Sequence, residues 1–272
     1  MSLRLPGQHF IRNLVAQRTL LYQMVRRDFE SRFVGSAGGW LWGVLHPLVL
    51  LASWTFVFQW CLKVPLPQNE VTQNYTMWLF CGYLPWMLFQ ETMARSSNCL
   101  LDHSNLITKT VFPSEVIPIS VFLSALVSHL MAMSMVIVAS LLWLGYVSGM
   151  IVLLPVYMLL NGLFAVGLGW ITASLQVYLR DTAQLVSVIL TLWFWTTPIF
   201  ITEKDVPAQL QALVHYNPMS FLVRAYRTHL LSYRIPESYF EDLAILTAFA
   251  VASFFIGGLF FRHLKRGFAD VL

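Results

Sequence analysis

The side chains that could carry chemistry in this sequence are few and far apart. Glu91 and Arg95 stand four residues apart in an apolar stretch, the spacing of an ion pair on one helix face. His46 and His129 each stand alone, without a carboxylate in the same stretch. Ionisable groups inside a membrane are costly and often form proton relays. One pair and two lone histidines are too few for a relay, so we expect an interfacial ion pair and two structural histidines.

The sequence lacks the motifs of nucleotide, protease and esterase chemistry. None of its four lysines follows a glycine, so the GxxxxGK[ST] loop that cradles phosphates is absent. Neither HExxH nor GxSxG occurs. Cys61, Cys81 and Cys99 are single residues without CxxC spacing or nearby histidines, which predicts neither disulfides nor a zinc site. We therefore expect no catalytic residue, cofactor or metal in this chain.

The composition is that of an integral membrane protein. Hydrophobic residues make up 57% of the 272 residues and charged residues 11%, which leaves too little polar surface for a water-soluble domain. The net charge of +4 comes from positive residues that gather near the ends of apolar segments. Membrane orientation produces that pattern, so it does not indicate a nucleic-acid surface.

Six apolar segments can be interpreted as α-helices that cross a membrane, for which about 20 residues are needed to span roughly 30 Å. They are residues 36–61, 76–95, 116–144, 150–178, 183–201 and 239–261. We predict an all-α fold, a single transmembrane domain over residues 1–272. With six spans, both termini lie on the same side of the membrane. Twelve Lys and Arg residues fall on that side and five on the opposite side, and this excess predicts that both termini are cytoplasmic.

Three further segments lie outside the spans. Residues 9–34 carry apolar side chains at helical spacing, which predicts an amphipathic helix on the cytoplasmic face. Arg18 interrupts that stripe, so an ordinary solvated helix that packs on a partner is the alternative. The sequence of residues 203–231 predicts two short helices separated at Tyr216-Asn217-Pro218. The helical conformation is disfavoured for a residue that precedes proline.

The loop at about 99–113 is short but apolar. It is too small to be a catalytic domain, and too apolar to be a solvated link, so it is either buried under the membrane domain or docked to another protein. We favour docking. The apolar residues that would make this contact are Leu100, Leu101, Leu106, Ile107, Val111 and Phe112.

Aromatic residues make up 15% of the chain and gather in three of the predicted spans. Most fit an interfacial belt or ordinary packing. The functional alternative is that some rings line a path and stack on the apolar faces of sugar rings. The candidates for such a path are Trp40, Trp42, Phe56, Trp78, Tyr83, Trp86, Trp193 and Trp195.

Seven stretches, in order along almost the whole chain, resemble the landmarks of ABC-2 type permeases that export polysaccharides. They are residues 27–42 (RDFESRFVGSAGGWLW), 112–118 (FPSEVIP), 178–181 (YLRD), 195–200 (WTTPIF), 206–207 (VP), 216–219 (YNPM) and 268–272 (FADVL). Each motif alone is weak. Their common order, in register with the predicted topology, is strong evidence for the permease family and weaker evidence for one polymer.

The resemblance implies a homodimer in the bacterial cytoplasmic (inner) membrane, paired with two copies of a separate ATPase that binds ATP and Mg. It implies that residues 99–113 are the coupling segment, that the N-terminal amphipathic helix lies at the interface beside it, and that a lipid-linked polysaccharide is moved. It also implies that the short helices at 203–231 form an outer gate. The gate residues would be Pro198, Phe200, Val206, Pro207, Tyr216, Asn217 and Pro218.

Two other functions stay open at this point. An ABC-2 permease that exports a small drug or lipid would use its aromatic residues for packing only. A membrane-embedded enzyme that acts on a glycolipid would need clustered polar catalytic groups, which the sequence does not display. An ion or proton-coupled carrier has still less support, because so few charges lie within the spans.

Overall fold

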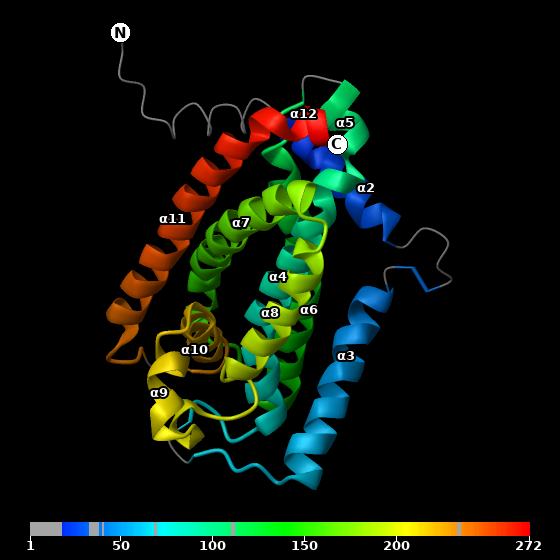
Figure 1. The fold of residues 1–272 in the computed structure, drawn as a ribbon. Helices are drawn as coiled ribbons and strands as arrows, with labels where there is room; N and C mark the ends of the chain where they lie inside the picture. The colour runs from blue at the N-terminus through cyan, green and yellow to red at the C-terminus, as the bar shows by residue number, and fades with distance from the viewer. Residues whose placement is uncertain (1–17, 33–37, 40, 68–69, 110–111, 233–234) are drawn as a thin grey trace.

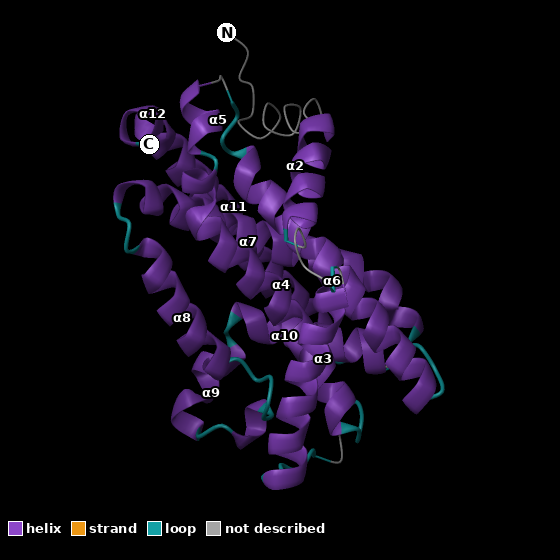
Figure 2. Cartoon of the chain, turned by 90° about the vertical axis from the view of Figure 1, so that its right-hand side faces the viewer, coloured by secondary structure: helices purple, strands orange, loops and turns teal. Residues whose placement is uncertain are grey.

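The structure is a computed structural model that describes residues 18–32, 38–39, 41–67, 70–109, 112–232 and 235–272. Within these ranges the chain is helical and contains no strand (Figure 2). The long helices are α2 (Arg18–Ser31), α3 (Leu41–Thr55), α4 (Tyr75–Asp102), α6 (Val116–Trp143), α7 (Leu154–Tyr178), α8 (Thr182–Thr196), α10 (Pro218–Leu231) and α11 (Tyr239–Leu264). The short ones are η1 (Phe56–Cys61), α5 (Ser104–Lys109), η2 (Gly149–Leu153), η3 (Glu203–Asp205), α9 (Ala208–His215), η4 (Lys265–Gly267) and α12 (Phe268–Val271).

Among the described residues, four helical stretches are long and apolar enough to cross a membrane. They are Leu41–Cys61, Val116–Trp143, Gly149–Tyr178 and Tyr239–Gly267. Helix α8 is apolar but shorter, and α4 mixes apolar residues with charged ones such as Glu91 and Arg95. The all-α membrane fold is therefore confirmed, whereas the count of six spans stays a prediction. Of the predicted N-terminal helix, residues 9–17 and 33–34 lie outside the described residues.

Helix α4 is the centre of the bundle. It packs against α6, α7, α8 and α10, and its large side chains, including Trp78 and Trp86, are almost completely enclosed. Helix α3 stands to one side, as Figure 1 shows, and of its side chains Pro47 and Leu51 are buried. One face of the bundle is thus tightly packed, while α3 and much of α8 offer apolar surface to lipid or to another subunit.

Small residues bring α7 and α11 into backbone contact. Ser253 and Gly257 stand four residues apart on α11 and face Gly167 of α7. A Cβ atom added to Gly257 would lie 2.0 Å from the carbonyl oxygen of Gly167, and one added to Gly167 would lie 2.4 Å from backbone atoms of Ser253. The Ser253 hydroxyl donates a hydrogen bond to the Phe164 carbonyl at 3.0 Å. Close approach through small residues is the usual way that membrane helices associate.

Substitution Gly257→Ala should therefore destabilise the protein. The added methyl group meets backbone that cannot rotate away, and such overpacking costs about 1–3 kcal/mol. The matched control is Gly258→Ala, because the nearest atom to its Cβ is a ring carbon of Trp170 at 3.5 Å, an ordinary contact. We expect thermal unfolding in detergent to occur at a lower temperature for Gly257→Ala and at the wild-type temperature or above for Gly258→Ala. Equal unfolding temperatures for the two variants would contradict this packing.

Candidate functional site

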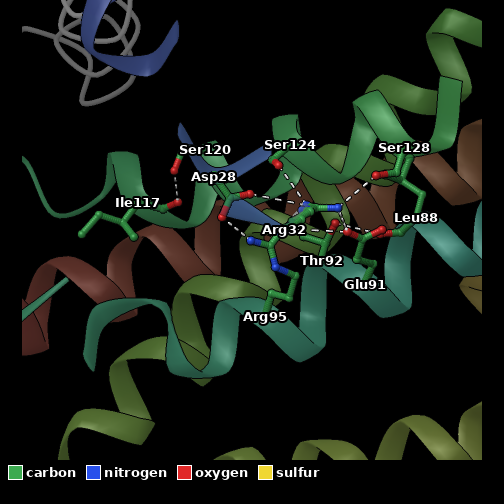
Figure 3. A network of polar contacts seen from close by, with 10 residues as sticks. All are labelled: Asp28, Arg32, Leu88, Glu91, Thr92, Arg95, Ile117, Ser120, Ser124 and Ser128. Atoms are coloured by element: carbon green, nitrogen blue, oxygen red, sulfur yellow. Dashed lines mark hydrogen bonds and ion pairs between the residues drawn. The ribbon is translucent and has the colours of Figure 1, made fainter. Parts of the chain in front are cut away.

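Charged side chains join three helices at the end of the bundle where α2 lies. Asp28 and Arg32 come from α2 and the residue after it, Glu91 and Arg95 from α4, and Ser124 and Ser128 from α6 (Figure 3). The Arg32 guanidinium forms an ion pair with Glu91 and donates hydrogen bonds to the hydroxyls of Ser124 and Ser128, each at 2.9 Å. Arg95 forms an ion pair with Asp28. We call these six residues the base cluster.

The base cluster consists of three pairs of residues that stand four apart, one from each of α4 and α6 and one from α2 and the residue after it. This spacing places both members of a pair on one face of their helix, so three such faces meet in the cluster. Within the helices the contacts are longer: 3.4 Å between Arg32 and Asp28, and 3.8 Å between Arg95 and Glu91. The predicted pair of Glu91 with Arg95 is confirmed, but the shorter ion pairs of both residues are made with α2.

The charges of the base cluster balance. Two carboxylates face two guanidinium groups, and the four side chains are only 19–31% exposed. Burial raises the pKa of Asp28, but hydrogen bonds from Arg95 and Ser124 and the charges of Arg95 and Arg32 outweigh burial and hold that pKa below its usual range. Asp28 is therefore ionised at neutral pH, and its ion pair with Arg95 can hold α2 against α4.

A second contact at this end of the bundle lies between the 99–113 loop and the C-terminal segment. Leu100 is fully buried, and Ile107 and Phe112 pack beside Trp170, Phe261 and Phe268. Lys265 forms an ion pair with Glu115, whose carbonyl accepts a hydrogen bond from the Trp170 indole at 3.0 Å. Both views show α5 and α12 side by side at the same end as α2 (Figures 1 and 2).

The loop residues predicted to dock a partner divide by exposure. Leu100 faces the chain's own core, where it holds the start of the loop, while Leu101, Leu106, Ile107 and Phe112 are half-buried. Val111 lies outside the described residues. Burial, one of the two sequence alternatives, therefore holds for Leu100, and docking of the loop to a partner stays a prediction.

The predicted path residues are not gathered on one surface of the single chain. Trp42, Phe56 and Trp195 are exposed, Trp193 is half-buried, and Tyr83, Trp78 and Trp86 are buried, while Trp40 lies outside the described residues. Some of them belong to packed clusters: the Trp86 indole donates to Gln90 at 2.7 Å, and the Trp193 indole donates to Asn217 at 2.8 Å. Their place in a path stays a prediction.

An aromatic cluster does connect α3, α4 and α8. The centre of the Trp54 ring lies 4.7 Å from that of Tyr83 and 5.2 Å from that of Phe200. The ring centres of Phe194 and Trp86 are 5.5 Å apart. Trp54 and Phe194 are not among the path candidates. The signal that could have singled out Trp54 is its spacing from Phe58, because residues four apart share a helix face, and Phe58 stacks on Phe200 at 4.5 Å.

At the opposite end, Asn217 separates α9 from α10. Its side-chain oxygen accepts hydrogen bonds from the Met219 amide and the Trp193 indole, and its amide donates to Thr197. Asn217 thus caps α10, and Pro218 occupies the first helical turn, where a missing N–H costs nothing. Of the other predicted gate residues, Pro198 and Phe200 are buried, Val206 and Pro218 are half-buried, and Pro207 and Tyr216 are exposed.

Arg227 is a polar residue whose buried place the sequence did not predict. It is buried, its guanidinium lies 3.3 Å from the centre of a Trp78 ring, and it donates to the carbonyls of Trp78 and Ile199. Gly82 makes room for it, because a Cβ there would lie 2.6 Å from an Arg227 nitrogen. Within the described ranges, no three His, Cys, Asp or Glu side chains come together as a metal site would require.

The profile of the family described as "ABC-2 type transporter" matches residues 19–231. The "O-antigen export system permease protein RfbA" of Myxococcus xanthus is 28% identical over 96% of this chain and 98% of the relative. A protein of the same name from Klebsiella pneumoniae is 28% identical over 93% of this chain and 95% of its own. The "Capsule polysaccharide export inner-membrane protein CtrC" of Neisseria meningitidis is 22% identical over 77% and 78%.

We predict that Arg32 and Glu91 stabilise the protein as a pair. Arg32→Gln or Glu91→Gln alone leaves a partly buried charge without its partner, which should lower the free energy of unfolding by about 1–3 kcal/mol. The double variant should lose less than the sum of the two single variants. The control is Arg26→Gln: Arg26 pairs with Glu30 on the same helix, but their side chains are 65% and 58% exposed. Its effect should be smaller than that of Arg32→Gln or Glu91→Gln, because the pair is exposed to solvent. Strict additivity of the first two substitutions would contradict the pairing.

The lowered pKa of Asp28 predicts how the stability of the protein changes with pH. A carboxylate whose folded pKa is lowered stabilises the fold above its unfolded pKa of about 3.9 and loses that contribution as the pH falls through the folded value. The difference in unfolding temperature between wild type and Asp28→Asn should therefore be the same at pH 7.5 and pH 5.5 and shrink only in stronger acid. Tryptophan fluorescence on heating measures it. A difference that shrinks already by pH 5.5 would show that the pKa is raised instead.

Proposed function

Because the chain belongs to the ABC-2 type transporter family, we propose that it is the permease subunit of an exporter that moves a lipid-linked polysaccharide across the cytoplasmic membrane. Similarity over nearly the whole chain to two O-antigen export permeases carries this proposal. The likeness to a capsule export protein supports the broader class of surface polysaccharides. ATP hydrolysis is assigned to a separate subunit, because the sequence has no P-loop.

The described contacts support a route for motion from an ATPase into the spans. The half-buried residues Leu101 and Leu106 would seat the loop on the ATPase, and Leu100, Ile107 and Phe112 attach the same loop to the core of the bundle. Beside it, the base cluster holds α2 to α4 and α6. A displacement of the loop or of α2 would then move whole helices, because packed elements shift as rigid bodies.

A homodimer with six spans in each chain accounts for the loosely covered side of the bundle. Helix α3 exposes Trp42 and Val49, and α8 exposes Leu185, Ile189 and Leu192, so both offer apolar faces to a second copy or to lipid. Aromatic residues on these helices would line a path between the two copies. The predominance of positive residues on one side of the predicted spans supports cytoplasmic termini in the inner membrane.

Helices α9 and α10 are proposed as the outer gate. Asn217 ties the turn between them to Trp193 and Thr197 at the end of α8. A movement of α8 would therefore move that turn. The break at Asn217 and Pro218 provides a place where the two short helices can change their angle.

The proposal is tested by co-expression with the ATPase encoded beside a polysaccharide gene cluster. We expect a complex with two copies of each chain and export of polysaccharide to the cell surface. Leu106→Glu should abolish co-purification of the ATPase, because a charge replaces an apolar contact, whereas Leu106→Met keeps an apolar side chain of similar volume and should retain the complex. Pull-down from detergent and a surface polysaccharide gel are the two measurements.

Failure to recover any complex under gentle detergent conditions would count heavily against the proposal. A complex that forms but confers drug resistance, with no change in surface polysaccharide, would identify the small-molecule exporter instead. Turnover of a glycolipid by this chain purified alone would identify an enzyme.

A further inference from the structure

Helix α11 stands at one side of the bundle, with α3 on the opposite side (Figure 1). It packs mainly on α7, and only five of its 26 residues are buried. The stretch Tyr239–Gly267, which contains α11, is long and apolar enough to cross a membrane. In the proposed homodimer the second copy meets α3 and α8, so the outward face of α11 is left in contact with lipid.

One stripe of that outward face changes from apolar to basic along the helix. The side chains of Phe255 and Leu259 are 57% and 64% exposed. Arg262 and Arg266 follow them along the helix and are also exposed. Spacings of four, three and four residues keep these four side chains within about 60° of one another around a helix of 3.6 residues per turn. The stripe therefore offers one partner both an apolar surface and two cations.

The length of α11 places the two arginines at the depth of lipid phosphates. Near the other end of the helix the Phe240 side chain is 77% exposed, and Arg262 comes 22 positions after it. At 1.5 Å per residue this separation is about 33 Å, close to the roughly 30 Å of a hydrocarbon core. Arg262 thus reaches the edge of the hydrocarbon, and Arg266 lies about one helical turn further, in the layer of the headgroups.

The protein itself supplies no counter-charge for this pair of arginines. Among the ion pairs that the described residues form, none includes Arg262 or Arg266. By contrast, Arg32, Arg95 and Arg224 each pair with a carboxylate. Basic side chains beside the headgroup layer attract anionic lipids. The missing counter-charge therefore points to an anion that the membrane provides.

The turn that carries the two arginines is fixed from its inward face. The Tyr178 hydroxyl donates a hydrogen bond to the Leu264 carbonyl at 3.0 Å. Lys265 forms an ion pair with Glu115, and the Phe268 ring is buried. A fixed turn loses less conformational freedom when it binds a ligand than a mobile segment does. Arginine is also the side chain whose planar fork can donate two parallel hydrogen bonds to phosphate oxygens.

We propose that Arg262 and Arg266 bind the headgroup of an anionic glycerophospholipid, such as phosphatidylglycerol, whose acyl chain lies along Leu259 and Phe255. A lipid is favoured over a soluble protein, because a soluble partner cannot reach the apolar half of the stripe inside the membrane. A headgroup with net negative charge is favoured over a zwitterionic one, because the two guanidinium groups lack a counter-charge among the described side chains. This binding is separate from the transported polymer and is measurable without transport.

The test is native mass spectrometry of the purified full-length chain in detergent, with phosphatidylglycerol or phosphatidylcholine of the same acyl chains added. We expect phosphatidylglycerol to bind about tenfold more tightly, because each of two basic residues contributes to the attraction of an anionic headgroup. Inorganic phosphate should not displace the bound lipid, since it lacks an acyl chain. The double variant Arg262→Gln with Arg266→Gln should lose the preference for phosphatidylglycerol.

The matched control is Arg27→Gln with Lys109→Gln. It removes the same charge from two exposed residues of α2 and α5, at the same end of the bundle, and should keep the preference. Equal affinity for the two lipids, displacement by inorganic phosphate, or equal losses in the two double variants would overturn the proposal. Lipid binding that survives substitution of Arg262 and Arg266, while co-purification of the ATPase is lost, would also overturn it and identify a protein contact. Loss of export with lipid binding intact would count against the transport function and not against the lipid site.

Discussion

A charge that leaves water must meet an opposite charge or enough hydrogen-bond partners, and this requirement determines how the base of the bundle is built. Glu91 and Arg95 lie on the most buried helix, and their own contact of 3.8 Å does not satisfy them. Asp28 and Arg32 supply the closer partners, and with them α2 is drawn against α4 and α6. The placement of α2 is thus a consequence of neutralising charges on another helix.

The same requirement acts at the other end of α4. Arg227 is buried beside Trp78, where two backbone carbonyls and an aromatic face replace water around its guanidinium. Gly82 leaves the space that the guanidinium fills. Helix α4 is therefore attached to α2 at one end and to α10 at the other by charged groups. A helix held in this way moves as one body with its attachments, which suits an element that connects the two ends of a transporter.

The helices of the bundle are packed tightly on one side and loosely on the other. Between α7 and α11, glycines allow backbone contact, and a single methyl group at Gly257 would not fit. On the other side, the rings of Trp54, Phe194 and Phe200 connect α3 and α8, and much of the surface of both helices is exposed. Backbone contact resists sliding, whereas rings on flexible side chains can repack. Movement during transport is therefore easier to accommodate on the side of α3 and α8.

Composition and the length of apolar runs were enough to predict an all-α membrane protein, because transfer of apolar groups out of water is a property of each segment by itself. The ordered motifs were enough to indicate the ABC-2 family, and spacing of four residues was enough to predict that Glu91 pairs with Arg95. What spacing could not supply is which helix faces meet. Asp28 reaches Arg95 across 67 positions, and Arg227 reaches Trp78 across 149. The base cluster and the buried Arg227 were decided by tertiary packing, since each needs side chains from separate helices whose mutual orientation no single segment encodes.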